Sequence, residues 1–309
     1  MEICLPMHDG TVTINFTIGF GNNLFQYTMG RLLAEKHNLS LRHRAIPEVG
    51  IEQKDSLVNS GLPVYIVNDG NYKEALYTRD LRGHNIVVSG YFEDYKILKG
   101  NLPRIRQWFD KVPVENTDDL ILHLRLQNRL VQVNHNKNHI TAESFKNAIS
   151  MFEYDRLHIV SDAEKWDQYT LQDIEKIRHE ISIGPNASAE WVKPEQSLEY
   201  MNHLIDGLST LDPVVHCNGD DMIKGSGGLR GGFIKDFNLL RSFNQVIVFN
   251  STFSWWAATL SGAQNVAIFN PWKIAKPVKD RRNLGKTSFP GWRSWGSPND
   301  LYFKKYKLN

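Results

Sequence analysis

The sequence predicts an α/β protein with parallel sheets and two domains. Its 309 residues are enough for two ordinary domains, each with its own core. Segments with strand patterning alternate along the chain with segments of helical periodicity, which favours parallel sheets. The polar, turn-forming residues 111–119 (KVPVENTDD) separate two such series and have the composition of a linker.

The first series opens with β-branched, alternating residues 11–18, which predict a strand. Residues 19–23 (GFGNN) predict a tight turn, because glycine adopts backbone angles closed to other residues. A helix with a broad apolar face should follow over residues 24–37 and stop at Asn38. The other elements expected in this half are strands at 63–67 and 85–89 and a helix at 104–109.

The second series restarts with an apolar strand at residues 120–124. Thr141 is placed to cap a helix over residues 142–152. The other elements expected in this half are strands at 156–160, 245–249 and 265–269 and helices at 233–241 and 252–260.

Composition excludes several classes of protein. The formal net charge of +2 argues against an extended nucleic-acid surface, so a basic site must be local. The two cysteines, Cys4 and Cys217, form no disulfide framework and predict a reducing compartment. Residues 1–10 lack the pattern of a signal peptide, and no stretch of 18 apolar residues occurs. We therefore expect a cytoplasmic protein, with peripheral contact with a membrane left open.

Two strand ends carry groups suited to an anion. The strand at 120–124 brings His123 and Arg125 to one face, two residues apart, and ligands of open α/β sheets collect at the carboxyl ends of strands. The strand at 245–249 runs into Asn250-Ser251-Thr252 and then a helix, whose free amides and hydroxyls favour an anion. Taken singly, a surface ion pair explains the first feature and N-capping the second. We expect Trp255 and Trp256 to pack in the core.

Two glycine-rich segments carry weaker signals. The Gly-x-Gly at residues 19–21 is also what a plain strand-to-helix turn shows. Residues 225–232 (GSGGLRGG) have the composition of a surface loop, and closure over a ligand is the alternative. No metal-ligand spacing occurs, so we expect no bound metal.

Taken together, these segments resemble glycosyltransferase family 11, the α-1,2-fucosyltransferases. The family's run Gly-x-Gly-Asn-Gln-x-Phe-Gln-Tyr is nearly matched by residues 19–27 (GFGNNLFQY). Its Asn-Ser-Ser-Phe-Ser-Trp-Trp-Ala-Ala is nearly matched by residues 250–258 (NSTFSWWAA). Between them, in the family's order, lie residues 90–92 (GYF), 123–128 (HLRLQN) and 161–166, with a Ser-Asp followed by Trp. The resemblance covers most of the chain, and its last segment is highly specific.

The resemblance implies a GT-B fold, in which two Rossmann-like domains face a cleft. Residues 1–114 would form the acceptor-side domain and residues 115–309 the donor domain, with the last segment packing back on the first. The implied reaction moves L-fucose from GDP-fucose to a galactoside hydroxyl of a glycan, with inversion, an α-1,2 linkage, no cofactor and no metal. The implied partners are the nucleotide sugar and the glycan acceptor.

The family's motifs also imply roles for single residues. Arg125 would hold the pyrophosphate, His123 would lie near the nucleoside, and Asp236 would accept from the guanine edge. Arg125 and Asn128 are the implied catalytic pair. The remaining donor-binding residues are Asp162, Asn250, Ser251, Thr252 and Phe253. The implied acceptor-side residues are Gly19, Gly21, Asn22, Asn23 and Gln26.

Two departures keep other functions open. The family's second arginine is Leu126 here and its aspartate is Asn128, although Arg129 offers a replacement charge. The alternatives are a related transferase that uses another nucleotide sugar and a protein that binds a glycan or a nucleotide sugar without catalysing transfer. Glu93, Asp94 and Asp9 are candidates for the base that deprotonates the acceptor hydroxyl.

Overall fold

The computed structural model describes residues 10–17, 19–124, 141–161, 204–216, 232–249, 251–269 and 291–295. Contacts divide the chain into two compact units, one holding the described residues up to Lys111 and the other those from Val112 onward. Each unit has its own mainly parallel sheet, which confirms the predicted fold class of two Rossmann-like α/β domains. The boundary at 114/115 and the role of each domain stay predictions.

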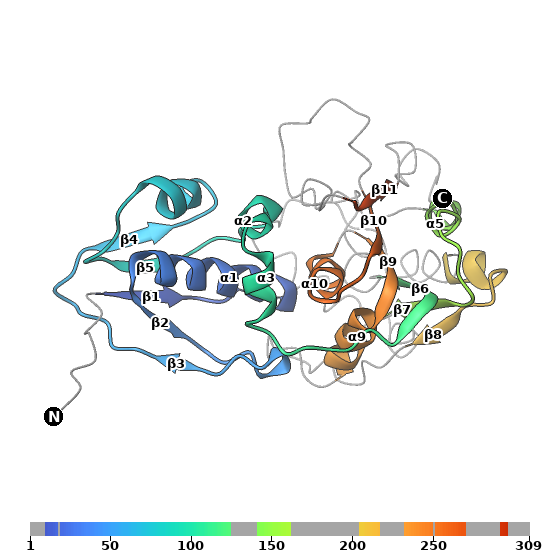
Figure 1. Ribbon diagram of the computed structural model, residues 1–309, viewed down its shortest axis with the longest axis horizontal. Coiled ribbons are helices and arrows are strands. Elements are labelled where there is room, and N and C mark those ends of the chain that lie inside the picture. The colour runs from blue at the N-terminus through green and yellow to red at the C-terminus, as the bar shows by residue number, and fades with distance from the viewer. Residues whose placement is uncertain are drawn as a thin grey trace, which may run out of the picture. The chain divides into compact units, whose positions relative to one another are not determined.

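The first unit is built on a five-stranded sheet in the order β3-β2-β1-β5-β4. The central strand β1 is parallel to β2 and β5, β5 is parallel to β4, and only β3 is antiparallel (Figure 1). The strands are β1 Thr11–Ile14, β2 Ser40–His43, β3 Lys54–Asp55, β4 Val64–Val67 and β5 Asn85–Val88. The carboxyl ends of the four parallel strands therefore meet at one edge.

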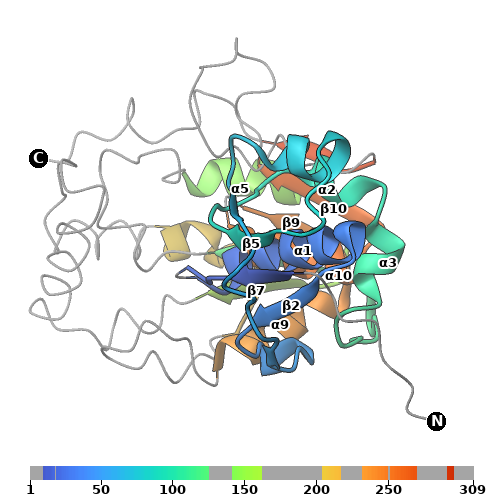
Figure 2. The same cartoon turned by 90° about the vertical axis from the view of Figure 1, so that its left-hand side faces the viewer.

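Helix α1, Phe20–His37, packs along β1 and contacts β2 and β5, as Figures 1 and 2 show. Close approach is possible because Gly30 faces Ile14: a Cβ at residue 30 would lie 2.3 Å from Ile14 Cδ1. The helix ends at Asn38, which takes a left-handed conformation with φ 53°, as expected from the sequence.

The start of α1 corrects the sequence prediction. The turn expected over residues 19–23 shrinks to Gly19, whose φ of 103° suits glycine alone, and Gly21, Asn22 and Asn23 already belong to the helix. The strand expected up to residue 18 ends at Ile14.

Short helices fill the rest of the first unit. They are η1 Pro47–Val49, a π-helical turn η2 Glu74–Thr78, α2 Tyr95–Lys99 and α3 Leu102–Arg106. The helix predicted at 104–109 thus begins two residues earlier and ends three earlier, because Pro103 occupies its first turn, where a proline is favoured.

The second unit contains a six-stranded parallel sheet in the order β11-β10-β9-β6-β7-β8. The strands are β6 Asn116–Leu124, β7 Leu157–Ser161, β8 Val214–His216, β9 Phe243–Val248, β10 Asn265–Phe269 and β11 Arg293–Trp295. The predicted linker is therefore too long, because residues from Asn116 on pair with β9.

Three helices of the second unit agree with the sequence. They are α5 Ala142–Ile149, α9 Gly232–Arg241 and α10 Thr252–Leu260. The side chain of Thr141 caps α5 by accepting from the N–H of Ser144, although the helix ends three residues before the predicted end at 152. Figure 1 shows α9 and α10 together beside β9, and the two helices contact each other.

Apolar side chains pack on both faces of the second sheet. Val246, Ile247 and Val248 of β9 are fully buried, as a strand in the middle of a parallel sheet requires. Trp255 and Trp256 are buried as well, which confirms their predicted place in the core. An aromatic cluster of Phe145, Phe249, Phe269 and Trp295 fills the region between α5 and the ends of β9, β10 and β11.

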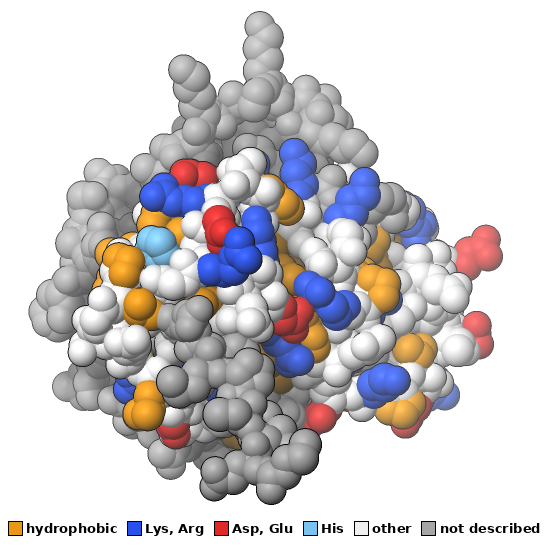
Figure 3. Space-filling model, turned by 60° about the vertical axis from the view of Figure 1, so that its left-hand side comes forward, with side chains coloured by type: hydrophobic (Ala, Val, Ile, Leu, Met, Phe, Trp, Pro, Cys, Tyr) orange, Lys and Arg blue, Asp and Glu red, His pale blue; other side chains and the backbone are white. Residues whose placement is uncertain are grey.

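The surface carries charges of both signs. Figure 3 shows Lys and Arg side chains interspersed with Asp and Glu on one face, with separate apolar patches between them. Within the described ranges, no helix combines the length and the apolar character that crossing a lipid bilayer requires.

Candidate functional site

The carboxyl edge of the second sheet brings two of the predicted anion-binding segments together. Strands β6 and β9 are parallel neighbours, with Leu122 paired to Ile247, so both end at the same edge. His123 lies one residue before the end of β6 and is buried. Ser251 follows β9 and precedes α10, so the two segments converge where α/β sheets bind ligands.

Ser251 is the N-cap of α10, yet its hydroxyl does not cap the helix. The residue is extended, with φ −140° and ψ 125°, and its side chain makes no bond to the first turn. Its Oγ is buried, with the residue 1% exposed, and has no hydrogen-bond partner among the described residues. N-capping therefore does not explain this serine, and a buried hydroxyl without a partner costs about 1–3 kcal/mol.

Aromatic rings join α10 to its neighbours. The ring of Phe253 lies 5.2 Å from that of His123, centroid to centroid, and 5.2 Å from that of Phe237 on α9. Phe233 on α9 lies 6.4 Å from the same ring. Asp236, which precedes Phe237, has a buried carboxylate oxygen. The structure thus gathers His123, Phe253 and the Asp236 segment around the start of α10.

This arrangement suits a compact anion. The first N–H groups of a helix carry a partial positive charge, and α10 places them beside a buried hydroxyl that can donate. The predicted residues Arg125, Asn128, Asp162 and Asn250 lie outside the described residues, as do residues 225–231 of the glycine-rich segment, whose last residue, Gly232, begins α9.

The first unit has its own carboxyl edge, where Gln26 links two strands. Gln26 is fully buried on α1. Its Oε1 accepts from the N–H of Thr17, beyond β1, at 3.0 Å, and its Nε2 donates to the carbonyl of Gly90, beyond β5, at 2.8 Å. The side chain predicted to face the acceptor therefore holds the strand ends together.

Asn23 also forms hydrogen bonds at this carboxyl edge. With its amide oriented to satisfy its neighbours, the nitrogen donates to the carbonyl of Thr17 at 2.8 Å and the oxygen accepts from Arg44 Nη2 at 3.2 Å. Gly19 provides the turn before α1, and Gly21 and Asn22 lie in its first turn.

Asp69 was missed by the sequence analysis. Its carboxylate follows β4 and accepts from the N–H groups of Tyr91 and Phe92, at 3.0 and 2.7 Å. Phe92 has a left-handed φ of 55°, which is unusual for a large side chain. An Asn-Asp-Gly run after the strand at 63–67 was the available signal, and it indicated a turn without naming its partner.

The carboxylate of Asp94 accepts two hydrogen bonds within the first unit. It caps α2 by accepting from the N–H of Lys96 at 2.9 Å, and it accepts from the hydroxyl of Tyr72 at 2.6 Å. Burial and the Asp94 carboxylate raise the pKa of Tyr72. Of the other candidate bases, Asp9 lies outside the described residues.

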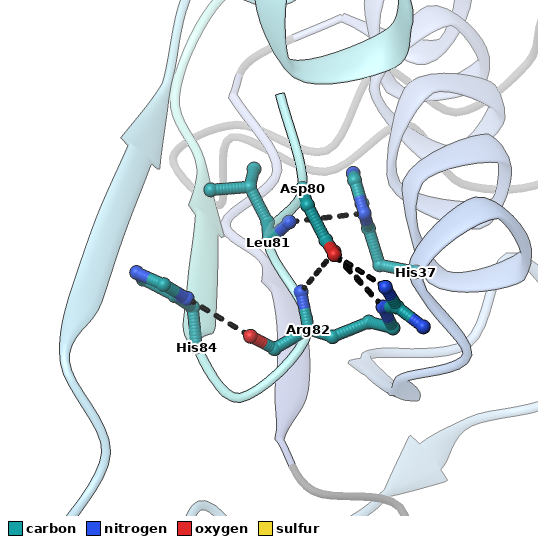
Figure 4. Close-up of polar contacts among 5 residues, drawn as sticks. All are labelled: His37, Asp80, Leu81, Arg82 and His84. Carbon is teal, nitrogen blue, oxygen red and sulfur yellow. Dashed lines mark hydrogen bonds and ion pairs between the residues drawn. The ribbon is translucent and has the colours of Figure 1, made fainter. Parts of the chain in front are cut away.

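Two polar clusters lie apart from these edges. At the end of α1, His37 donates from Nε2 to the carbonyl of Ala75 and accepts at Nδ1 from the N–H of Leu81, next to the Asp80–Arg82 ion pair (Figure 4). Burial lowers the pKa of His37. These bonds hold the segment after η2 against α1.

The second cluster lies toward the amino ends of β6 and β7. His158 Nδ1 lies 2.8 Å from His216 Nε2, and His158 Nε2 lies 3.2 Å from Asp119 Oδ2. Among the residues that the structure describes, no group of three or more His, Cys, Asp or Glu is arranged to hold a metal ion.

Part of the second unit is similar to a known protein family. Residues 214–293 match the family model described as Glycosyl transferase family 11. The match runs from β8 to the first residue of β11 and so includes Asp236, Ser251, Thr252 and Phe253. No significant match was found among curated proteins or among solved structures.

Proposed function

We propose that the chain is a glycosyltransferase that moves L-fucose from GDP-fucose to a galactoside hydroxyl of a glycan. The match of residues 214–293 to the family model described as Glycosyl transferase family 11 supports this proposal. The transfer inverts the anomeric centre, forms an α-1,2 linkage and uses no metal. The second unit binds the donor, the first unit binds the acceptor, and both substrates are met in the cytoplasm.

One observation carries the donor site: the buried Ser251 hydroxyl at the start of α10 lacks a protein partner among the described residues. A diphosphate oxygen would supply the missing acceptor and would also meet the N–H groups of the first turn. Thr252 and Phe253 follow in that turn. Ligand binding would thus offset the cost of burying this hydroxyl without a partner among the described residues.

The other donor contacts follow from the chemistry of GDP. Guanine presents two N–H donors on one edge, which a carboxylate such as Asp236 satisfies. His123, in ring contact with Phe253, would lie beside the nucleoside. Arg125, two residues after His123, adds a guanidinium for the pyrophosphate, with Asp162 and Asn250 completing the set.

The leaving group explains why these donors accelerate the transfer. When the bond between the sugar and the β-phosphate breaks, negative charge develops on the phosphate oxygen. The proposed contacts of amides, a hydroxyl and an arginine with that oxygen would stabilise the charge, and removal of one such donor typically costs about 3 kcal/mol. Asn128, three residues after Arg125 in the sequence, is the second proposed catalytic residue.

A serine-to-alanine change tests the donor site. Ser251→Ala should weaken GDP binding about 10- to 100-fold, the value of one hydrogen bond to a charged group. The free variant should melt at the same temperature as the wild type or higher, because it lacks a buried hydroxyl that has no hydrogen-bond partner in the part of the chain that the structure describes. Calorimetric titration with GDP and a melting curve measure both effects.

Ser261 is the matched control at the other end of α10. It is also buried, but its hydroxyl donates to the carbonyl of Ala258 and accepts from the N–H of Ala263. Ser261→Ala should lower the melting temperature and leave GDP affinity unchanged. Undiminished GDP affinity in Ser251→Ala would refute the proposed phosphate site.

The identity of the sugar needs a separate measurement. GDP-fucose, GDP-mannose and UDP-sugars are compared by the rise in melting temperature, and GDP release is followed with a galactoside present. The proposal predicts a shift with GDP and GDP-fucose and release that depends on the acceptor. A shift with another nucleotide sugar alone, or binding without release, would overturn it.

A further inference from the structure

We propose that Phe233, in the first turn of α9, is the residue on which the purine base of the donor stacks. This inference rests on the donor site proposed for the second unit, and every residue that it uses belongs to that unit. It assigns the flat face of the base, whereas the contacts named above concern its edge, the nucleoside and the phosphates.

The order of the elements brings the first turn of α9 to the carboxyl edge of the second sheet. Helix α9 contacts β9 and ends just before that strand begins, so the helix runs back along the strand from its carboxyl end. Helix α10 follows β9 and begins at the same edge, and Figure 1 shows both helices beside the strand. The first turns of α9 and α10 therefore lie where α/β sheets bind ligands.

Aromatic rings at this edge form two layers. The inner layer is His123 and Phe237, which are both buried. The ring of Phe253 packs on both of them, with centroids 5.2 Å apart in each pair. Phe233 and Phe253, whose centroids are 6.4 Å apart, are only partly buried and form the outer layer. The outer layer thus offers aromatic surface beside the phosphate site that begins at Ser251.

Helical spacing relates Phe233 to the carboxylate proposed for the guanine edge. Residues three or four apart are neighbours on one side of a helix, so Phe233, Asp236 and Phe237 share a side of α9. The ring contact between Phe237 and Phe253 shows that this side is turned toward the start of α10. A base whose edge meets Asp236 would therefore have its rings near the first turn of α9, which carries Phe233.

The chemistry of a nucleobase suits this arrangement. Its two faces are flat π surfaces, whereas its edge is polar, so an aromatic ring and a carboxylate can bind one base together. Stacking on an aromatic side chain typically changes the affinity about 5- to 150-fold. A purine covers more of a phenyl ring than a pyrimidine does. Phe233 would thus favour purine nucleotides, and Asp236 would select guanine among them.

Phe233→Leu tests the stacking, because leucine keeps an apolar side chain against α10 and removes the aromatic surface. We expect the affinity for GDP to fall about 10-fold. The affinity for pyrophosphate, which has no base, should stay at the wild-type value and shows that the variant is folded. Phe233→Tyr keeps the ring and should bind GDP as the wild type does. Calorimetric titration of the full chain measures each affinity.

Phe145→Leu is the matched control in the other aromatic cluster of the second unit. Phe145 is 1% exposed on α5, and its ring contacts those of Phe249 and Trp295. The substitution should lower the melting temperature and leave the ratio of GDP affinity to pyrophosphate affinity unchanged. A change in that ratio is therefore the signature of a residue that contacts the nucleoside, which loss of packing alone would not produce.

Inosine diphosphate separates the face of the base from its edge. It has the purine rings of GDP without the 2-amino group, so it keeps the stack and loses one N–H donor. Phe233→Leu should weaken the binding of GDP and of inosine diphosphate by the same factor. Asp236→Asn should weaken the binding of GDP by the larger factor, because only GDP uses both N–H donors.

The outcomes separate this inference from the proposed function. If Phe233→Leu binds GDP as tightly as the wild type, or loses affinity for GDP and pyrophosphate equally, the base does not stack on Phe233 and transfer from GDP-fucose still stands. If the wild type binds GDP no more tightly than pyrophosphate, both proposals are wrong. If the wild type binds GDP through Phe233 but releases none from GDP-fucose with a galactoside present, the stacking stands and the proposed transfer is wrong.

Discussion

At the scale of single residues, buried polar side chains differ between the two units in whether the described residues satisfy their hydrogen bonds. The Ser251 hydroxyl is buried without a protein partner among the described residues, whereas the Gln26 amide is buried with both ends bonded. The first arrangement leaves a bond for a ligand and the second completes the fold. The sequence motifs predicted both residues to belong to a binding site, and only their hydrogen bonds in the structure distinguish them.

Residue-level prediction from sequence was therefore uneven. The buried positions of Trp255 and Trp256 follow from an apolar segment after a buried strand, and local pattern is enough to find them. The link from Gln26 to Gly90 joins residues 64 apart, and the link from Asp69 to Phe92 joins residues 23 apart. No local pattern encodes such pairs, so Asp69 was missed.

Gly30 provides a test of packing at this scale. Gly30→Ala would place a Cβ 2.3 Å from Ile14 Cδ1, and Ile14 is buried and has little room to move. We expect the free energy of unfolding to fall by about 1–3 kcal/mol, measured by denaturant titration. Gly100→Ala, where nothing lies within 4 Å of the new Cβ, should change it by less than about 0.5 kcal/mol. Equal effects of the two changes would contradict the role given to Gly30.

At the scale of elements, strands β4, β5 and β10 were predicted to within one residue at each end, whereas β1 ends four residues before its predicted end. Strand β9 and helix α10 carry continuous apolar runs with a polar break between them, and their bounds agree with the sequence within two residues. Strand β2 was missed because Ser-Leu-Arg-His has no clear alternation, and it forms through pairing with β1. The short strands β8 and β11 likewise depend on neighbours in the sheet.

The start of α1 shows how a motif misled the prediction. Gly-Phe-Gly-Asn-Asn is a turn by composition, yet one residue, Gly19, completes the turn. Asn23 then enters the helix because its amide binds Thr17 and Arg44 instead of competing for its own backbone. Tertiary contacts thus override a local preference.

The contact between α1 and the segment after η2 predicts a pH effect on stability. The neutral His37 ring must keep Nδ1 free of a proton to accept from Leu81, and burial lowers its pKa below the unfolded value of about 6.5. Above that pH both states are neutral. As the pH falls below it, the unfolded chain takes up the proton first, so the free energy of unfolding should decrease.

Denaturant titration at pH 7.5 and pH 5 measures this effect. His37→Gln should reduce the loss of stability between the two pH values, whereas His84→Gln, drawn in the same cluster in Figure 4, should leave it unchanged. Part of the loss should remain in His37→Gln, because burial also lowers the pKa of His43 and of His216. If His37→Gln loses as much stability between pH 7.5 and pH 5 as the wild type does, the buried His37 ring does not cause the pH dependence of stability.

At the scale of the whole molecule, the sequence predicted two α/β units from the alternation of elements, and the structure has two such sheets. The mixed charges in Figure 3 agree with a small net charge and with recognition by local sites rather than by an extended field. The roles proposed for the two units, acceptor binding and donor binding, come from the family resemblance and not from the pattern of elements in the sequence.

The most direct measurement is a crystal structure of the full chain with GDP bound. The account predicts that the diphosphate accepts hydrogen bonds from the Ser251 hydroxyl and from the N–H groups that begin α10, with Arg125 on the same phosphate oxygens and Asp236 at the guanine edge. A diphosphate bound elsewhere, with the Ser251 hydroxyl still buried and unoccupied, would contradict it.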